Sequence, residues 1–499
     1  MMMLSKLSFW FVLMGLFACL SCSNNVEASP PNMIMFIADD ISWNDFGCYG
    51  NPAARTPHID QLAREGIRFD RAFLTASSCS PSRSSIITGR YPHNNGKAAE
   101  LHAPISSHLP WFPELLREAG YYTAISGKHH MKAVDPDVRP PAFEHVDGGK
   151  VKGDTSGAAN WLSVTKDRPR QRPFFFWFAS YDAHRVWDGD QQWKTEYGPQ
   201  HDWRDVVVPP FLVDDEVTRR DLASYYNEVT RFDFKIGEII SELRRQRVLD
   251  DTLVLILADN GRPFPRAKTR LHDSGMKTAM VAHWPNGLAW NGTSNQLVSV
   301  IDLAPTFLSV AGCPLPKTLQ GVSMQPLFRE SDASIRRFAF SEHNWHDYEA
   351  HGRSIRDGEF LFIRNGRPQF AWQGPADSVR SDSHRQLLNA RSAGTLAPAQ
   401  EDVFRAPRPS SELYRLTEDP FQLMNLAGQD QYRDVEERLA ATLAMWIDQT
   451  ADSLPEQLTP DTFDRTTGKR LAKRGAMPKG TLTPGEDRGA DRVHHPGPR

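Results

Sequence analysis

The sequence Cys79-Ser80-Pro81-Ser82-Arg83 places a nucleophilic thiol four residues before a guanidinium cation. The proline suits the first turn of a helix, where its missing N–H costs little. A helix that begins here would direct free backbone N–H groups and a favourable dipole towards an anion beside Cys79, and Arg83 could reach back to the same point. The alternative is a small buried thiol, because free cysteines are among the most buried residues. That alternative leaves Pro81, Arg83 and the following Thr88-Gly89-Arg90 unexplained.

Carboxylate and amide side chains follow two continuous apolar runs. Asp39-Asp40 comes directly after residues 33–38, and Asp259-Asn260 directly after residues 252–258. Such residues often begin loops or cap helices. If both runs are strands of a parallel sheet, however, their carboxyl ends meet at the edge where ligands bind. A set of oxygen ligands favours a hard divalent cation such as Ca²⁺, whereas zinc would call for histidine or cysteine.

The Cys79 pattern, continued through Ile86-Ile87 and Thr88-Gly89-Arg90, resembles the signature of the type I sulfatases. In that family the cysteine is converted after synthesis to formylglycine, and one hydroxyl of the aldehyde hydrate attacks sulfur. The resemblance therefore implies a formylglycine at Cys79, made by a formylglycine-generating maturation enzyme, and hydrolysis through a covalent intermediate from which sulfate is eliminated. It also implies one Ca²⁺, with ligands from Asp39, Asp40, Asp259, Asn260 and the modified Cys79. A thiolate is a soft ligand that suits Ca²⁺ badly, which agrees with such a conversion.

Two further residues follow a short apolar run at 121–125. The segment Gly127-Lys128-His129-His130 is similar to the family's Gly-Lys-x-His element. The resemblance implies that Lys128 steadies the formylglycine oxygen and that His130 removes a proton from the second hydroxyl. A histidine suits that proton transfer near neutral pH.

The resemblance also supplies a second histidine and a distal cation. His184, shortly after the apolar run at 174–179, is similar to the histidine that contacts sulfate and is the candidate to protonate the leaving group. Lys268 matches the cation that binds sulfate, although Arg266 and Arg270 are close enough in sequence to replace it.

The family motifs do not specify a substrate; we expect a sulfated carbohydrate, and two local features bear on which one. Arg262-Pro263-Phe264-Pro265 looks like the corresponding stretch of the N-sulfoglucosamine sulfohydrolases, the heparan N-sulfatases. It could shape the pocket or serve as a rigid turn, so N-sulfated glucosamine and O-sulfated sugars both stay open. A polar and aromatic cluster suits either a sugar or packing between subdomains. Its members are His343, Trp345, His346, Asp347, Tyr348, His351 and Arg353.

Two other functions compete with this interpretation. A phosphohydrolase of the same superfamily would also place a nucleophile beside metal-bound carboxylates, but it commonly uses serine or threonine and a histidine-rich site with two metals. A catalytically inactive carbohydrate-binding homologue would keep the fold without the chemistry. Every residue of the expected site is present, which favours an active sulfatase.

The elements around these residues indicate an α/β protein. Unbroken apolar runs are typical of strands covered on both faces, and residues 221–245 show helical spacing of apolar side chains. Strands that alternate with helices predict a mainly parallel central sheet within a catalytic domain at 30–328. A smaller α+β subdomain is expected at 329–453, with a strand at 360–363 and a terminal helix at 436–446. Residues 454–499 are expected to form an extended or partly disordered tail.

The first 29 residues resemble a secretory signal, with Lys6 before an apolar run at 7–20 that is too short for a comfortable membrane span. We therefore expect an exported protein, periplasmic, secreted or at the cell surface, with no membrane span in the mature form. Cys19 or Cys22 could carry a lipid anchor. Three remaining cysteines do not make a disulfide framework. A net charge of −3 argues against general nucleic-acid binding.

Overall fold

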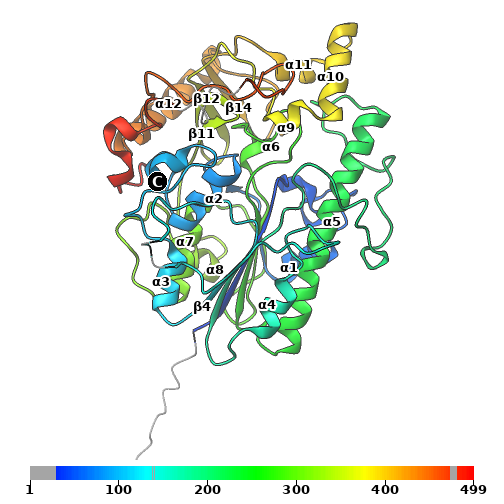
Figure 1. The fold of residues 1–499 in the computed structure, drawn as a ribbon. Helices are drawn as coiled ribbons and strands as arrows, with labels where there is room; N and C mark the ends of the chain where they lie inside the picture. Colours follow the sequence, from blue (N-terminus) through cyan, green and yellow to red (C-terminus); the bar gives the residue numbers. More distant parts are fainter. Residues whose placement is uncertain (1–29, 138, 140, 473–479) are drawn as a thin grey trace, which may run out of the picture.

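The computed structural model describes residues 30–499, apart from 138, 140 and 473–479. The signal-like segment predicted at 1–29 lies outside the described residues. A large α/β subdomain carries a smaller subdomain with an antiparallel sheet (Figure 1). This architecture confirms the predicted fold class. Among the described helices, none is long and apolar enough to cross a membrane.

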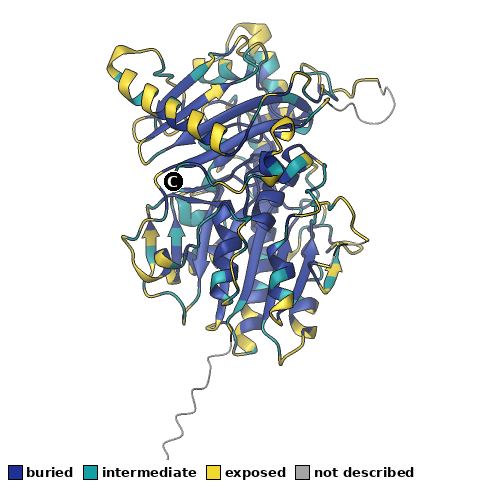
Figure 2. Ribbon diagram, turned by 90° about the vertical axis from the view of Figure 1, so that its left-hand side faces the viewer, coloured by how far each residue is buried: buried dark blue, intermediate teal, exposed yellow. Residues whose placement is uncertain are grey.

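The central sheet has eight strands in the order β5-β4-β6-β1-β7-β8-β2-β9. Every pairing is parallel except those of β8 with β7 and with β2. The strands are β1 (Asn32–Ala38), β2 (Ile67–Phe69), β4 (Tyr122–Gly127), β5 (His145–Asp147), β6 (Phe174–Ala179), β7 (Thr252–Ala258), β8 (Met280–His283) and β9 (Gly292–Ser294). The central strands β6, β1 and β7 are apolar along nearly their whole length because both of their faces are covered. Figure 2 shows this sheet as buried, with exposed residues in the outer helices and loops.

Helices cover both faces of the central sheet (Figure 1). One face packs against α1 (Pro57–Glu65), α4 (Trp161–Asp167) and α5 (Glu216–Arg245), and the other against α2 (Cys79–Thr88), α3 (Phe112–Glu118), α7 (Leu303–Val310) and α8 (Gln325–Arg329). The predicted helix at 221–245 is part of α5, which begins five residues earlier. Asp215 caps this helix by accepting a hydrogen bond from the Thr218 backbone N–H at 2.8 Å.

The smaller subdomain is built on four antiparallel strands in sequential order. These are β11 (Ala339–His346), β12 (Tyr348–Arg356), β13 (Phe360–Asn365) and β14 (Ser411–Arg415). Helix α12 (Arg433–Gln449) packs its apolar side against this sheet through Leu439, Leu443 and Trp446. The short helices nearby are α9 (Ala376–Val379), α10 (Asp382–Ala393) and α11 (Pro398–Glu401). In the larger subdomain, β3 (Ala72–Phe73) pairs with β10 (Val298–Ser299), and α6 (Asp273–Met276) precedes β8.

The described residues after 453 lie against both subdomains. In the smaller one, the Glu349 backbone N–H donates to Asp461 at 2.8 Å. In the larger one, the Arg90 guanidinium donates to the carbonyls of Val493 at 2.7 Å and Asp491 at 3.2 Å. The end of the chain thereby contacts the Thr88-Gly89-Arg90 segment directly after α2.

Candidate active site

Three adjacent strands end at the same place. In the sheet, β1 lies between β6 and β7, so Asp39-Asp40, Asp259-Asn260 and the loop to His184 leave one edge together. Backbone hydrogen bonds continue past the strand ends, from the Asp39 N–H to the Asp182 carbonyl at 2.8 Å and from the Asp259 N–H to the Ala38 carbonyl at 3.1 Å. The four predicted oxygen ligands are therefore neighbours.

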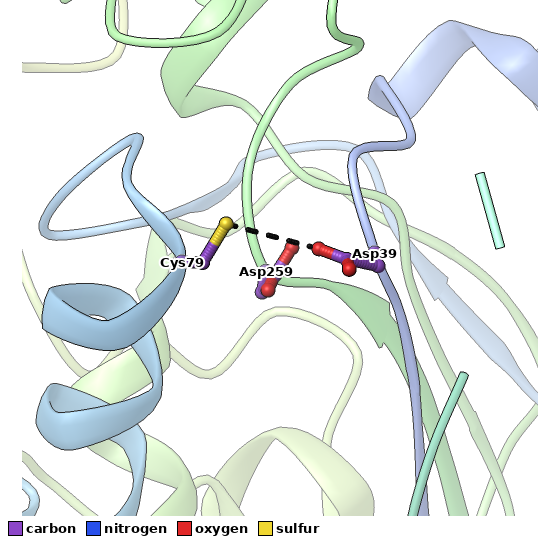
Figure 3. A group of neighbouring side chains, drawn as sticks. All are labelled: Asp39, Cys79 and Asp259. Atoms are coloured by element: carbon purple, nitrogen blue, oxygen red, sulfur yellow. Dashed lines mark hydrogen bonds between the residues drawn. The ribbon is translucent and has the colours of Figure 1, made fainter. Parts of the chain in front are cut away.

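Cys79 faces these carboxylates from the first turn of α2 (Figure 3). Its Sγ lies 3.8 Å from Asp39 Oδ1 and 3.9 Å from Asp40 Oδ1. The residue is 2% exposed. Burial raises the pKa of the Cys79 thiol well above its ordinary value, and the nearby Lys128 and Lys268 only partly oppose this. The predicted start of a helix at this cysteine is confirmed.

Arg83 and Lys128 bind the same carboxylates from the α2 side. The Arg83 Nε donates to Asp259 Oδ2 at 2.7 Å, and its Nη1 donates to the Lys128 carbonyl at 2.8 Å. The Lys128 ammonium pairs with Asp39. Burial alone would lower the pKa of Lys128, but Asp39 raises it above its ordinary value, so the ammonium stays charged. Both cations belong to the group around Cys79.

The structure distinguishes Lys268 from its two neighbouring arginines. The Lys268 Nζ lies 2.7 Å from Asp40 Oδ2. Arg266 and Arg270 instead pair with Asp402. Of the three candidates, only Lys268 therefore joins the carboxylates of the strand ends.

The Pro263-Phe264-Pro265 segment is a structural turn that supports Lys268. The Phe264 side chain is fully buried and stacks on Trp187 with ring centroids 6.1 Å apart. The backbone N–H of Lys268 donates to the Arg262 carbonyl at 3.1 Å, which closes the turn. This packing favours the rigid-turn alternative for Phe264.

The two predicted histidines occupy different surroundings. His184 is half-exposed, and its Nε2 lies 3.9 Å from carboxylate oxygens of both Asp40 and Asp377. His130 follows β4, and its Nε2 lies 2.7 Å from Nδ1 of His102. Burial, followed by the charge of Lys128, lowers the pKa of His130 below its ordinary value. This lowered pKa favours the neutral form of the His130 ring.

Three residues near the site were not among the predicted site residues. Asp377 lies 3.5 Å from the Lys268 Nζ, and this cation keeps its pKa low although burial would raise it. His346 pairs through Nδ1 with Ser78 Oγ at 2.8 Å, and His102 contacts His130 as described above. His346 belongs to the polar and aromatic cluster at 343–353. The other two come from a loop and a short helix without a sequence pattern, so only the folded chain brings them here.

The polar and aromatic cluster at 343–353 is mostly buried in the smaller subdomain. Four of its members bind residues 452–464, through Trp345 to the Pro460 carbonyl, Tyr348 to the Asp464 carbonyl, His351 to the Ser453 carbonyl and Arg353 to Asp452. Arg353 is 1% exposed. These four side chains therefore bind residues 452–464 rather than the larger subdomain, and this contact, which neither alternative named, occupies the polar groups that a sugar would need.

The donor set at the strand ends fits a hard divalent cation. Potential ligand atoms of Asp39, Cys79 and Asp259 all lie within 4.8 Å of one another. Asn260 Oδ1 is buried and has no hydrogen-bond partner among the described residues, whereas a buried carbonyl oxygen is normally satisfied. Asp39, Asp40, Asp259 and Asn260 would hold such an ion by oxygen atoms alone.

Comparison with known proteins agrees with this geometry. A family model described as Sulfatase matches residues 31–313, and one described as N-sulphoglucosamine sulphohydrolase, C-terminal, matches residues 266–365. Human N-sulphoglucosamine sulphohydrolase is 32% identical over 477 residues, which cover 87% of this chain and 93% of that protein. An ulvan-active sulfatase from Formosa agariphila is 28% identical over 480 residues, covering 85% of this chain and 76% of that protein.

The fold is shared with solved structures. One, a protein in complex with its substrate D-glucosamine-2-N,6-O-disulfate, has a TM-score of 0.63 at 18% sequence identity and covers 84% of this chain and 98% of that chain. The sulfatase model spans more than half of this chain, and the human relative matches along nearly its whole length. This chain therefore belongs to the sulfatase family of sulfuric ester hydrolases.

Proposed function

We propose that the protein hydrolyses sulfate from a sulfated sugar, with a formylglycine made from Cys79 as its nucleophile and one Ca²⁺ held by Asp39, Asp40, Asp259 and Asn260. The observation that carries this proposal is the position of Cys79. It lies at the first turn of a buried helix, within 4 Å of the Asp39 and Asp40 carboxylates that follow β1, within 4.8 Å of Asp259 after β7, and inside a group of cations. The bound ion would polarise a sulfate oxygen and offset charge in the transition state.

The contacts of Lys128, Lys268 and Arg83 suggest a different role for the lysines and for the arginine. Lys128 pairs with Asp39 and Lys268 with Asp40, and both cations act on Cys79, so both are available to an anionic group there. Arg83 has its guanidinium bonded to Asp259 and to the Lys128 carbonyl, so it fixes the positions of both partners. We infer that Arg83 orients the site and that the lysines bind sulfate.

The two histidines suit proton transfer at the two ends of the reaction. His184 is half-exposed beside Asp40, at a point that a leaving group can reach from solvent. His130, neutral and more enclosed, can take a proton from a hydroxyl on residue 79. We therefore propose His184 as the acid for the leaving group and His130 as the base.

For the substrate, we propose N-sulfated glucosamine as the first sugar to test. The support is the match of the C-terminal N-sulphoglucosamine sulphohydrolase model to residues 266–365, a stretch that includes Lys268 and His346. O-sulfated sugars are the alternative, because the ulvan-active relative aligns with similar coverage of this chain.

The test is sulfate release by protein that mass spectrometry shows to carry formylglycine at residue 79. The substrates are glucosamine N-sulfate, glucosamine 6-sulfate and the unsulfated sugar, with ion chromatography as the readout. We expect release from at least one sulfated sugar and none from the Cys79→Ala variant. Retained turnover by Cys79→Ala would refute the assignment of the nucleophile. Release from glucosamine 6-sulfate alone would refute the N-sulfate proposal while leaving the chemistry intact.

We also propose that the protein is exported. The support is the sequence pattern at 1–29, a lysine followed by a short apolar run. Cell fractionation, with N-terminal sequencing of the mature protein, tests this proposal, and a cytoplasmic protein with an intact N-terminus would refute it.

A further inference from the structure

Two histidine rings from separate loops are joined beside the candidate site. His102 lies between the 3-10 helix η3 (Pro92–Ala99) and α3, and His130 lies just after β4. His102 Nδ1 and His130 Nε2 are 2.7 Å apart, and the ring centroids are 4.7 Å apart with a tilt of 42°. This is a short and direct hydrogen bond between two imidazoles.

The backbone holds both rings in place. His102 has φ = 66° and His130 has φ = 54°, which is a region that residues other than glycine rarely adopt. Such conformations persist where the surrounding structure fixes them, and they cluster at functional sites. Here the fixing contact comes from the helix that carries Cys79, because the backbone N–H of His102 donates to Ser80 Oγ at 2.7 Å. The neighbouring Leu101 packs in a small apolar cluster with Cys79.

One hydrogen must occupy the bond between the two rings, and its position decides what His130 can do. Burial and nearby lysines lower the pKa of both histidines, so both rings are neutral at neutral pH. A neutral imidazole has one N–H and one lone pair. If His130 carries its hydrogen on Nε2, its Nδ1 is left with the lone pair. If His102 donates instead, His130 must carry its hydrogen on Nδ1 and cannot act there as a base.

The surroundings of His130 Nδ1, the second ring nitrogen, favour one of these two tautomers. His130 Nδ1 is buried and has no hydrogen-bond partner among the described residues. A buried polar atom is normally satisfied, so an unpartnered one suggests that a substrate or a modified side chain completes it. The acceptor for a proton is therefore available on the side of His130 that His102 does not occupy.

We propose that His102 is a positioning residue that accepts the Nε2–H of His130 and thereby fixes the tautomer in which Nδ1 is the base. This inference rests on the proposed function, in which His130 takes a proton from a hydroxyl on residue 79. In that step the O–H bond breaks, its electron pair stays on oxygen, and a new N–H bond forms at Nδ1. The covalent Nε2–H bond of His130 stays intact. The hydrogen bond that this N–H donates to His102 becomes charge-assisted and stabilises the His130 imidazolium.

The kinetic test compares two substitutions of His102. His102→Gly removes the ring and tolerates the positive φ, whereas His102→Asn also tolerates this φ and keeps an oxygen that can accept the Nε2–H. We expect kcat to fall roughly tenfold to a hundredfold in His102→Gly with little change in KM, and to recover to within about fivefold of the parent in His102→Asn. The matched control is His108→Asn, since this exposed histidine on the same segment bonds, within the described part of the chain, to Asp491 alone. A kcat within twofold of the parent in His102→Gly, or equal losses in both His102 variants, would overturn the proposal.

A second measurement does not need sulfatase activity. In protein labelled with ¹⁵N at histidine and left unmodified at Cys79, the nitrogen signals that disappear in His130→Gln identify the His130 ring. We expect a protonated, pyrrole-type Nε2 and an unprotonated, pyridine-type Nδ1, with this preference lost in His102→Gly. A hydrogen on Nδ1 would overturn the proposal even if the protein releases sulfate. The expected signals, together with no sulfate release by separately prepared protein that carries formylglycine at residue 79, would instead refute the proposed function and leave the histidine pair standing.

Discussion

Replacement of Arg353 by methionine distinguishes a structural role from a role in sugar binding. The Arg353 Nε and Nη2 donate to the two oxygens of Asp452 at 2.6 and 2.8 Å, and both residues are almost fully buried. This pairing holds the pKa of Asp452 below its ordinary value, although burial would raise it. In Arg353→Met the Asp452 carboxylate stays buried without its main partner.

The expected loss follows from this geometry. Removal of one partner from a buried ion pair costs about 3–5 kcal/mol in the free energy of unfolding, because the other charge is left uncompensated. Removal of both charges, in Arg353→Met with Asp452→Leu, should cost much less than Arg353→Met alone. As a surface control, Arg385→Met breaks an exposed pair with Asp382 and should cost less than about 1 kcal/mol.

The assay combines urea denaturation, followed by tryptophan fluorescence, with kinetics of sulfate release from the best sugar in the panel. We expect Arg353→Met to lose stability while KM stays within about twofold of the parent, since the guanidinium has no free face for a sugar. A loss below about 1 kcal/mol together with a large rise in KM would refute this reasoning and assign Arg353 to the substrate.

Three other outcomes are expected. Burial and Arg353 lower the pKa of His351 to about 3, while a histidine in the unfolded chain titrates near 6.5. The unfolded state therefore binds the extra proton first, and the free energy of unfolding should fall as pH drops below about 6.5, by up to about 1.4 kcal/mol per pH unit. In urea denaturation at pH 7, 6 and 5, His351→Gln should show a smaller dependence of stability on pH. Gly127→Ala should lower the free energy of unfolding by roughly 3 kcal/mol or more, because φ is +100° and the new Cβ would meet the Ala179 carbonyl. Gly120→Ala, with φ of +94° and open space around the new Cβ, should lose only the cost of the backbone strain in the same urea denaturation. When a formylglycine-generating enzyme is added to folded protein with an unmodified Cys79, the cysteine should stay unconverted, because α2 is buried along its length. A peptide of residues 70–95 should be converted. Mass spectrometry measures both, and conversion of the folded chain would contradict the burial of this helix.

The sheet and much of the candidate site were predictable because they depend on local sequence. Continuous apolar runs predicted β1, β6 and β7, and the side chains that follow them meet because parallel strands end on one edge. The proline after Cys79 indicated the start of α2. In each case, residues close in sequence carried both the signal and the structure.

Contacts between distant segments could not be read in this way. Asp377 reaches Lys268 from a helix of four residues, and His102 reaches His130 from a loop, so neither has a periodic pattern around it. The choice of Lys268 over Arg266 and Arg270 depends on Asp402, more than a hundred residues later, which pairs with both arginines. Composition alone also gave no sign that the residues after 453 bind Trp345 and Arg90.

The contact of Arg90 with the end of the chain can form only after nearly the whole chain has been synthesised. Arg90 closes the segment that follows α2, yet its partner Asp491 is 401 residues later in the sequence. At ordinary synthesis rates of about 5–20 residues per second, this separation corresponds to roughly 20–80 s. During that interval the Cys79 segment has been synthesised, but the residues at the end of the chain that contact Arg90 have not. Under the proposed function, this delay in synthesis is the period in which a formylglycine-generating enzyme would reach Cys79 before the chain end contacts Arg90.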